Sequence, residues 1–196
     1  MRRMLVTVVA AGVVIALAVG TVGCGGEQAA GATPAGHAPA GHASASVMQA
    51  EVYIQVLRRY LSTPAENSFP GQAFKTVYVL DRAYRDAADP GGKHHRGTPI
   101  TAQTRRQVTA ALAGMAHLVF ITSRDSVIET RDGCGQVKNG GILITLGPPA
   151  VVGHQVHVAV NGWVACLGAT WLTYILQRQP GSGWRVTGTT GTMAIS

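Results

Sequence analysis

The longest apolar run of the chain lies at its start, between two arginines and a cysteine. After Arg2 and Arg3, residues 4–23 carry no charged side chain, and Cys24 follows directly. A short basic tip, an apolar run and small residues before a defined end are the layout of an export signal. The remaining chain is therefore expected to fold outside the cytoplasm, in a compartment where disulfides persist.

The end of this leader resembles a bacterial lipobox, and residues Thr21-Val22-Gly23-Cys24 carry the resemblance. Gly23 and Cys24 match the family, while Thr21 stands where the family usually has leucine. The resemblance implies that Cys24 is lipidated on its thiol and that residues 1–23 are removed as a signal peptide. With its excess of arginine over lysine and its many alanines, glycines and valines, the chain is similar to lipoproteins of high-GC Gram-positive bacteria.

Two alternatives to the lipoprotein interpretation stay open. The apolar run of residues 4–23 is about long enough to cross a hydrocarbon core of roughly 30 Å, so it is also compatible with an uncleaved transmembrane anchor. A plain secretory signal would instead release the protein. All three interpretations leave the positive end inside and the domain on the extracytoplasmic side of the cell membrane.

The segment after Cys24 cannot build a core. Residues 25–46 contain only Gly, Ala, Ser, Thr, Pro and His besides one Glu-Gln pair. Such a composition is typical of a flexible tether. We therefore divide the chain into a signal peptide (1–23), a lipidated cysteine with its tether (24–46) and a single domain (47–196), which is long enough to bury a sizeable core.

The net charge does not indicate nucleic-acid binding. The chain has 16 basic and 9 acidic residues, and cleavage of the leader removes Arg2 and Arg3 and leaves a formal charge of +5. The remaining basic residues are dispersed, and no basic run is interleaved with aromatic residues. The expected partners are membrane lipid through Cys24 and an unknown protein, an envelope component or a small apolar ligand, with no nucleic acid.

Three cysteines are present. With Cys24 assigned to lipid, Cys134 and Cys166 remain as an even pair in an oxidising compartment, which predicts a disulfide. Two buried free thiols are the alternative. Cys134 has no neighbouring Cys or His at the spacing of a zinc site.

Hydrophobic periodicity predicts an α+β domain: two helices packed on a curved, mainly antiparallel sheet that ends in a four-stranded meander. The first helix should begin near Ser46 and end before Pro64, and the second should follow an N-cap at Thr101, with Val108, Ala111, Leu112 and Met115 buried. Strands are expected at residues 74–80, 117–122, 141–146, 154–160, 163–177 and 184–195. A turn is expected at Asp132-Gly133. A hairpin turn is expected at Asn161-Gly162, because Asn-Gly between apolar runs favours one, and Gly168 should mark a bulge or bend.

The order of these elements over residues 47–195 loosely resembles that of the NTF2-like and SnoaL-like folds. The resemblance rests on no sequence motif, and so it implies the fold alone and assigns no functional residue.

No motif assigns a chemistry to the domain. The sequence lacks a phosphate-binding glycine loop, a G-x-S-x-G elbow, an H-E-x-x-H helix and a C-x-x-C pair. We therefore assign no catalytic residue, no metal ligand and no cofactor. The densest polar cluster, with Asp81, Asp86, Asp89, His94 and His95, is interpreted as a solvated loop.

The leading hypothesis is a non-enzymatic, membrane-anchored binding or interaction module. One alternative is a small secreted enzyme with a site in the concavity of the sheet, using Asp81, Asp86 or His117. Another is metal binding through His37, His42, His94 and His95. Trp163, Trp171 and Trp184 are expected mainly to pack in the core, with an aromatic pocket as the alternative.

Overall fold

The computed structural model of the chain describes residues 40–69, 74–93 and 96–196. The described residues all belong to one compact unit that spans Ala38–Ser196. The leader, Cys24 and His37 lie outside the described residues, and so the predictions on them stay predictions. None of the described helices is long and apolar enough to cross a membrane.

Two long helices and one short helix accompany the sheet: α1 (Ala40–Ser62), α2 (Pro64–Asn67) and α3 (Ala102–Leu112). The strands are β1 (Thr76–Leu80), β2 (Arg82–Ala83), β3 (Thr98–Pro99), β4 (His117–Ile121), β5 (Ile128–Arg131), β6 (Cys134–Val137), β7 (Ile142–Leu146), β8 (Ala150–Val152), β9 (Gln155–Ala165), β10 (Gly168–Gln179) and β11 (Gly183–Ile195). Two 3-10 turns, η1 (Arg124–Val127) and η2 (Lys138–Gly140), flank the β5–β6 hairpin. The prediction of an α+β domain is confirmed at this level.

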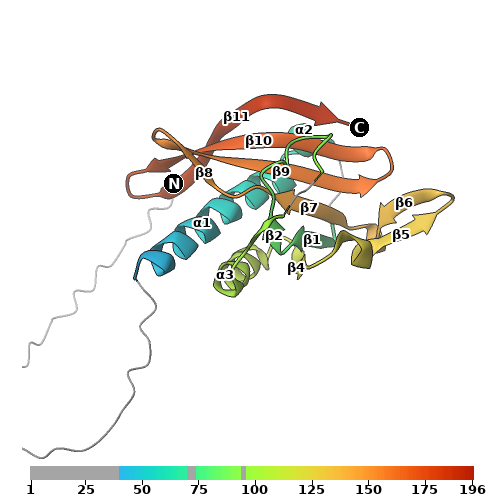
Figure 1. Cartoon of the computed structure of the whole chain (residues 1–196), viewed down its shortest axis with the longest axis horizontal. Coiled ribbons are helices and arrows are strands. Elements are labelled where there is room, and N and C mark those ends of the chain that lie inside the picture. The colour runs from blue at the N-terminus through green and yellow to red at the C-terminus, as the bar shows by residue number, and fades with distance from the viewer. Residues whose placement is uncertain (1–39, 70–73, 94–95) are drawn as a thin grey trace, which may run out of the picture. The chain divides into compact units, whose positions relative to one another are not determined.

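The main sheet is mixed and curled (Figure 1). Its strand order is β11-β10-β9-β7-β1-β4, and β5, β6 and β8 join it beside β9. β1 pairs in parallel with β4 and with β7, while the pairs that involve β5 to β11 are otherwise antiparallel. β2 and β3 form a separate two-stranded ribbon. The curved, mainly antiparallel sheet is thus present.

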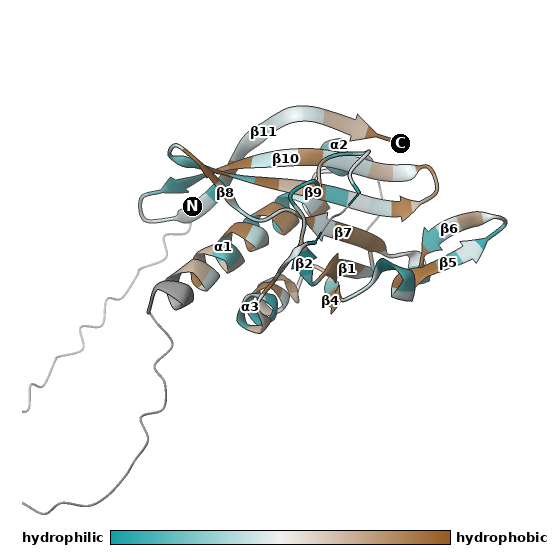
Figure 2. Ribbon diagram, viewed as in Figure 1, coloured by the Kyte–Doolittle hydropathy of each residue, from teal (hydrophilic) through white to brown (hydrophobic). Residues whose placement is uncertain are grey.

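Helix α1 lies along one face of the long strands and fills the concave side of the sheet (Figures 1 and 2). Its side chains Val52, Tyr53, Val56, Leu57 and Tyr60 are fully buried. They pack in one core cluster with the alternate residues of the strands: Val77, Val79, Ile142, Ile144, Val156, Val158, Val160, Leu172, Tyr174 and Leu176. The residues that recur with the helical period of 3.6 therefore pack, on this face, against those that recur with the strand period of 2.

The opposite face of the sheet is covered over only part of its width. Tyr78, Leu80 and Leu143 point to this face and form a second cluster with Val127 and Val137, which come from η1 and β6. The covering elements stop beside β9. Beyond them, residues of β9 and β10 line a cavity on this face.

The Asn161-Gly162 hairpin predicted from sequence is wrong. β9 continues through both residues to Ala165, and the chain turns at Cys166-Leu167 instead. Two tertiary contacts explain the difference. A Cβ atom on Gly162 would lie 2.7 Å from Cζ of Tyr60, so glycine is required by the approach of α1 and not by a turn. Asn161 Nδ2 donates to the carbonyl oxygen of Thr170 on β10 at 3.1 Å.

The helix predictions hold in type and differ in detail. Thr101 caps α3 as expected, with its Oγ1 accepting from the backbone N–H of Thr104 at 3.1 Å. The buried stripe of α3 is Thr104, Val108 and Leu112, whereas Ala111 and Met115 are exposed.

The starts of α1 and β10 also differ from the expectation. α1 begins at Ala40 rather than near Ser46, within an alanine-rich stretch that favours helix. Gly168 opens β10 and does not lie inside a longer strand, but the irregularity predicted at this glycine is confirmed by a register shift between Gly168 and Ala169.

Three tyrosine hydroxyls tie this helical layer to the strands. Tyr53 donates to the carbonyl oxygen of Gly147 at 3.0 Å, Tyr60 and Thr170 Oγ1 lie 2.5 Å apart, and Tyr174 donates to Glu66 at 2.8 Å. Burial raises the pKa of all three phenols above the ordinary value. Each phenol therefore ionises more easily in the unfolded chain than in the folded one.

We expect this difference to make unfolding strongly pH-dependent at alkaline pH. The stabilisation is fully present below about pH 10, where unfolded tyrosine titrates, and is lost as the pH rises further. With three phenols the slope reaches up to about 4 kcal/mol per pH unit. Tyrosinate absorbance should report three groups that ionise only together with unfolding, and Tyr60→Phe should remove one of them. Reversible ionisation of all five tyrosines in the folded protein would contradict this expectation.

Candidate functional site

Two rows of cross-strand neighbours form the uncovered part of the outer sheet face. In one row Thr145, Asn161 and Trp171 are direct neighbours on β7, β9 and β10. In the next row Leu143, Trp163 and Ala169 are direct neighbours on the same strands. Residues opposite each other in such rows are about 5 Å apart and diagonal ones about 7–8 Å apart. The register therefore brings Trp163 and Trp171, on different strands, close together.

A rim rises around this floor. The turn at Asp89-Pro90 and Gly92 forms one wall, Arg124 on η1 another, and Cys166 and Ser196 close the side near the β9–β10 turn. Together with Leu80 and the floor these residues line a cavity of about 250 Å³. The rim is held by short-range bonds: Asp89 Oδ1 accepts from the N–H of Gly91 at 2.9 Å.

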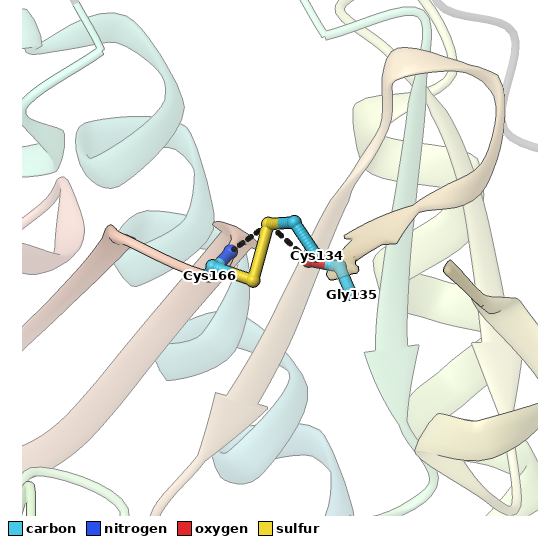
Figure 3. The surroundings of a disulfide bond; sticks show 3 residues. All are labelled: Cys134, Gly135 and Cys166. Carbon is cyan, nitrogen blue, oxygen red and sulfur yellow. Dashed lines mark hydrogen bonds between the residues drawn. A yellow bond between two sulfur atoms is a disulfide. The ribbon is translucent and has the colours of Figure 1, made fainter. Parts of the chain in front are cut away.

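The disulfide partners lie at the edge of this cavity. Cys134 begins β6 and Cys166 stands in the β9–β10 turn, 32 residues apart in sequence (Figure 3). Their Cα atoms are 5.6 Å apart, within the range that a disulfide spans. The structure thus brings together the two cysteines that the sequence analysis paired. Their position ties the β5–β6 hairpin to the turn that carries Cys166, a residue of the cavity wall.

The cavity combines aromatic faces with a small set of polar groups. The guanidinium of Arg124 lies 5.4 Å from the ring centre of Trp163, in the range of a cation–π contact. Thr145 is largely buried and lines the cavity. Asn161 commits its Nδ2 to Thr170, which leaves its Oδ1 as an acceptor at the cavity. Aromatic walls with a few fixed polar groups are typical of small-molecule sites.

The structure does not bring together the three residues named for the enzyme alternative. His117 is exposed and pairs with Thr76 at the start of β1, whereas Asp81 follows the end of β1. A five-residue strand separates these two positions by about 16 Å. Asp81 lies 3.5 Å from Arg105 of α3, which gives its carboxylate a structural partner. Asp86 belongs to the compact turn before Gly92 and does not line the cavity.

The polar loop residues are only partly described. Within the described ranges, no three His, Cys, Asp or Glu side chains gather as metal ligands would. His94 and His95 lie outside the described residues, as does His37, and His42 falls within α1. The hypothesis of metal binding through these histidines therefore stays a hypothesis.

The three tryptophans separate into two groups. Trp163 and Trp171 line the cavity, whereas Trp184 packs against the core cluster on the α1 side. All three tryptophans were candidates for an aromatic pocket from sequence, whereas the positions of Arg124, Thr145 and Asn161 at a cavity were not predicted. Asn161 was hidden by the turn signal of Asn-Gly. The positions of Arg124 and Thr145 depend on β7–β9 pairing and on η1, which no local pattern reveals.

Comparison with models of known protein families, with curated proteins and with solved structures found no match to this chain. The resemblance of its element order to the NTF2-like and SnoaL-like folds stays a prediction. The function of the protein has to be argued from its own residues.

Proposed function

We propose that the protein is a membrane-anchored extracytoplasmic lipoprotein that binds a small ligand in the cavity floored by Trp163 and Trp171. The ligand has an apolar ring face, which stacks on indole, and a polar edge, which reaches Thr145 and Asn161. The role is binding and not catalysis. Lipidation of Cys24 would hold the domain at the outer side of the cell membrane, with residues 25–39 as the link to α1.

One observation carries this proposal: two indoles, a guanidinium and two polar side chains from four separate segments (η1, β7, β9 and β10) line one cavity. The cavity of about 250 Å³ suits a small molecule rather than a peptide segment.

The enzyme alternative has less support. Its site was expected in the concavity of the sheet, and apolar side chains of α1 fill that side. Its candidate residues Asp81 and His117 lie at opposite ends of β1 and β4. The cavity on the other face has one carboxylate side chain in its lining, that of Asp89, whose Oδ1 already accepts a backbone hydrogen bond.

We expect Trp171→Ala to remove ligand binding without unfolding the protein, because Trp171 is half-buried and lines the open cavity. Native mass spectrometry of full-length protein, extracted in mild detergent from the cells that make it, should show a retained small molecule that Trp171→Ala loses. Phe120→Ala is the matched control, since Phe120 is also a half-buried aromatic residue but lies on β4, outside the lining of this cavity. Equal ligand retention by both variants would contradict the proposed site.

The anchor has its own test. Cys24→Ala removes the thiol that the lipobox resemblance marks for acylation, and so the protein should stay unprocessed or leave the membrane fraction. The measurement is the mass of the protein in the membrane and soluble fractions. Normal processing with unchanged membrane retention would rule out lipidation at Cys24, whereas retention with the leader still attached would favour a transmembrane anchor.

A further inference from the structure

A second cleft lies on the α1 side of the sheet, remote from the tryptophan cavity. The C-terminal turns of α1 contribute Gln55, Arg58, Arg59 and Ser62 to it, and the start of β11 with the turn before it contributes Ser182, Trp184, Arg185 and Val186. These residues line an open cleft of about 420 Å³. We call this region the arginine cleft. Three of its side chains are guanidinium groups, and none is a carboxylate.

One of the three guanidinium groups is already neutralised. Arg59 contacts both carboxylate oxygens of Glu66, and Tyr174 donates to the same carboxylate at 2.8 Å. Burial by itself would raise the pKa of Glu66, but the hydrogen bonds from Arg59 and Tyr174 outweigh burial and hold this pKa below its usual value. Glu66 is therefore charged at neutral pH and fixes Arg59 as a wall of the cleft.

The other two guanidinium groups are exposed to solvent and lack a counter-charge among the described residues. Arg58 and Arg185 form no hydrogen bond or ion pair with any residue of the described ranges. The carbonyl end of α1 contributes about −0.5 charge nearby. Because two positive charges exceed this contribution, the net charge of the cleft stays above +1. An anion bound in the cleft would neutralise these two charges.

The donors in the cleft define the chemistry that fits it. Each guanidinium presents planar N–H groups that match a phosphate bidentately. The side-chain amide of Gln55 is half-buried, has no hydrogen-bond partner among the described residues and supplies a further donor. The hydroxyl of Ser62 donates to the carbonyl oxygen of Arg58 at 2.8 Å and so supports the helix end. A dianionic group that spans Arg58 and Arg185 satisfies both free charges.

We propose that the arginine cleft is a binding site for a phosphorylated ligand, held by Arg58 and Arg185 beside the wall formed by Trp184. This site is independent of the tryptophan cavity. The phosphate can belong to a lipid headgroup or to a soluble molecule, and both present the same oxygens to the cleft.

The full chain in an uncharged detergent is titrated with inorganic pyrophosphate or with short-chain phosphatidylglycerol. Short-chain phosphatidylcholine is the zwitterionic reference. Calorimetry should give saturable binding with one of the first two probes. Arg58→Gln and Arg185→Gln should each weaken it about tenfold, and the double variant should abolish it. Arg185→Lys should retain only part of the affinity for the probe, since a lysine keeps the charge but loses the planar arrangement of donors.

Arg106→Gln is the matched control, because it removes the same charge from an exposed residue on α3 that lies outside the cleft. Binding of pyrophosphate assigns a soluble phosphate, and binding of phosphatidylglycerol alone assigns a lipid headgroup. No saturable binding with either probe would overturn the proposal. So would an equal loss in Arg106→Gln, which would show general charge attraction in place of a site.

Discussion

Gly162→Ala is expected to destabilise the protein by about 3 kcal/mol, at the upper end of overpacking in a well-packed core. The new methyl group would lie 2.7 Å from Cζ of Tyr60 and closer still to its hydroxyl. Neither side can retreat, because Tyr60 is fully buried and its hydroxyl is held 2.5 Å from Thr170 Oγ1. For a domain of this size the loss corresponds to roughly 10 °C in Tm.

Thermal and urea unfolding of the variant would measure this effect. Gly188→Ala in β11 is the matched control, since no atom lies within 4 Å of the position of its Cβ and it should change stability by less than about 0.5 kcal/mol. Tyr60→Phe removes the atom closest to the new methyl group, so the double variant should lose less than the sum of the single variants. Full additivity would show that the steric contact is not the cause.

The second large effect is expected from loss of the bond between Cys134 and Cys166. A cross-link that closes a loop of 32 residues stabilises by about 3–4 kcal/mol in the chain-entropy model. Replacing both cysteines by serine should cost that amount. It should also weaken ligand binding at the tryptophan cavity, because Cys166 forms part of its wall.

Urea unfolding with and without reductant would measure the stability change, and the double serine variant should be insensitive to reductant. Non-reducing mass spectrometry of the wild-type protein should recover Cys134 and Cys166 in one linked peptide pair. Alkylation of both thiols without reductant would contradict the cross-link.

Local patterns predicted those parts of the fold that depend on neighbours in sequence. Thr101 caps α3 because a threonine oxygen three residues before an N–H reaches it whatever the rest of the chain does. Asp132-Gly133 turns the β5–β6 hairpin because both residues adopt positive φ. The alternation of Val156, Val158 and Val160 marks one buried face for the same local reason.

The prediction failed where a distant contact outweighs a local preference. Asn161-Gly162 has the composition of a turn, but α1 presses Tyr60 against Gly162, and Asn161 bonds across to β10. The same residues then divide the two faces of the sheet, glycine toward the helix and asparagine toward the cavity. No pattern within a few residues of Asn161 contains that information.

The sequence by itself determined the class of the domain, the pairing of its two cysteines and the expectation of an anchored, exported protein. The class follows from hydrophobic periodicity, the pairing from the two cysteines that remain besides Cys24, and the expected export from the order of basic, apolar and small residues in the leader. Only the tertiary structure decided that α1 fills the concave side and that Trp163 and Trp171 meet on the outer face. Strand register and helix docking set those positions, and both depend on contacts between residues many positions apart.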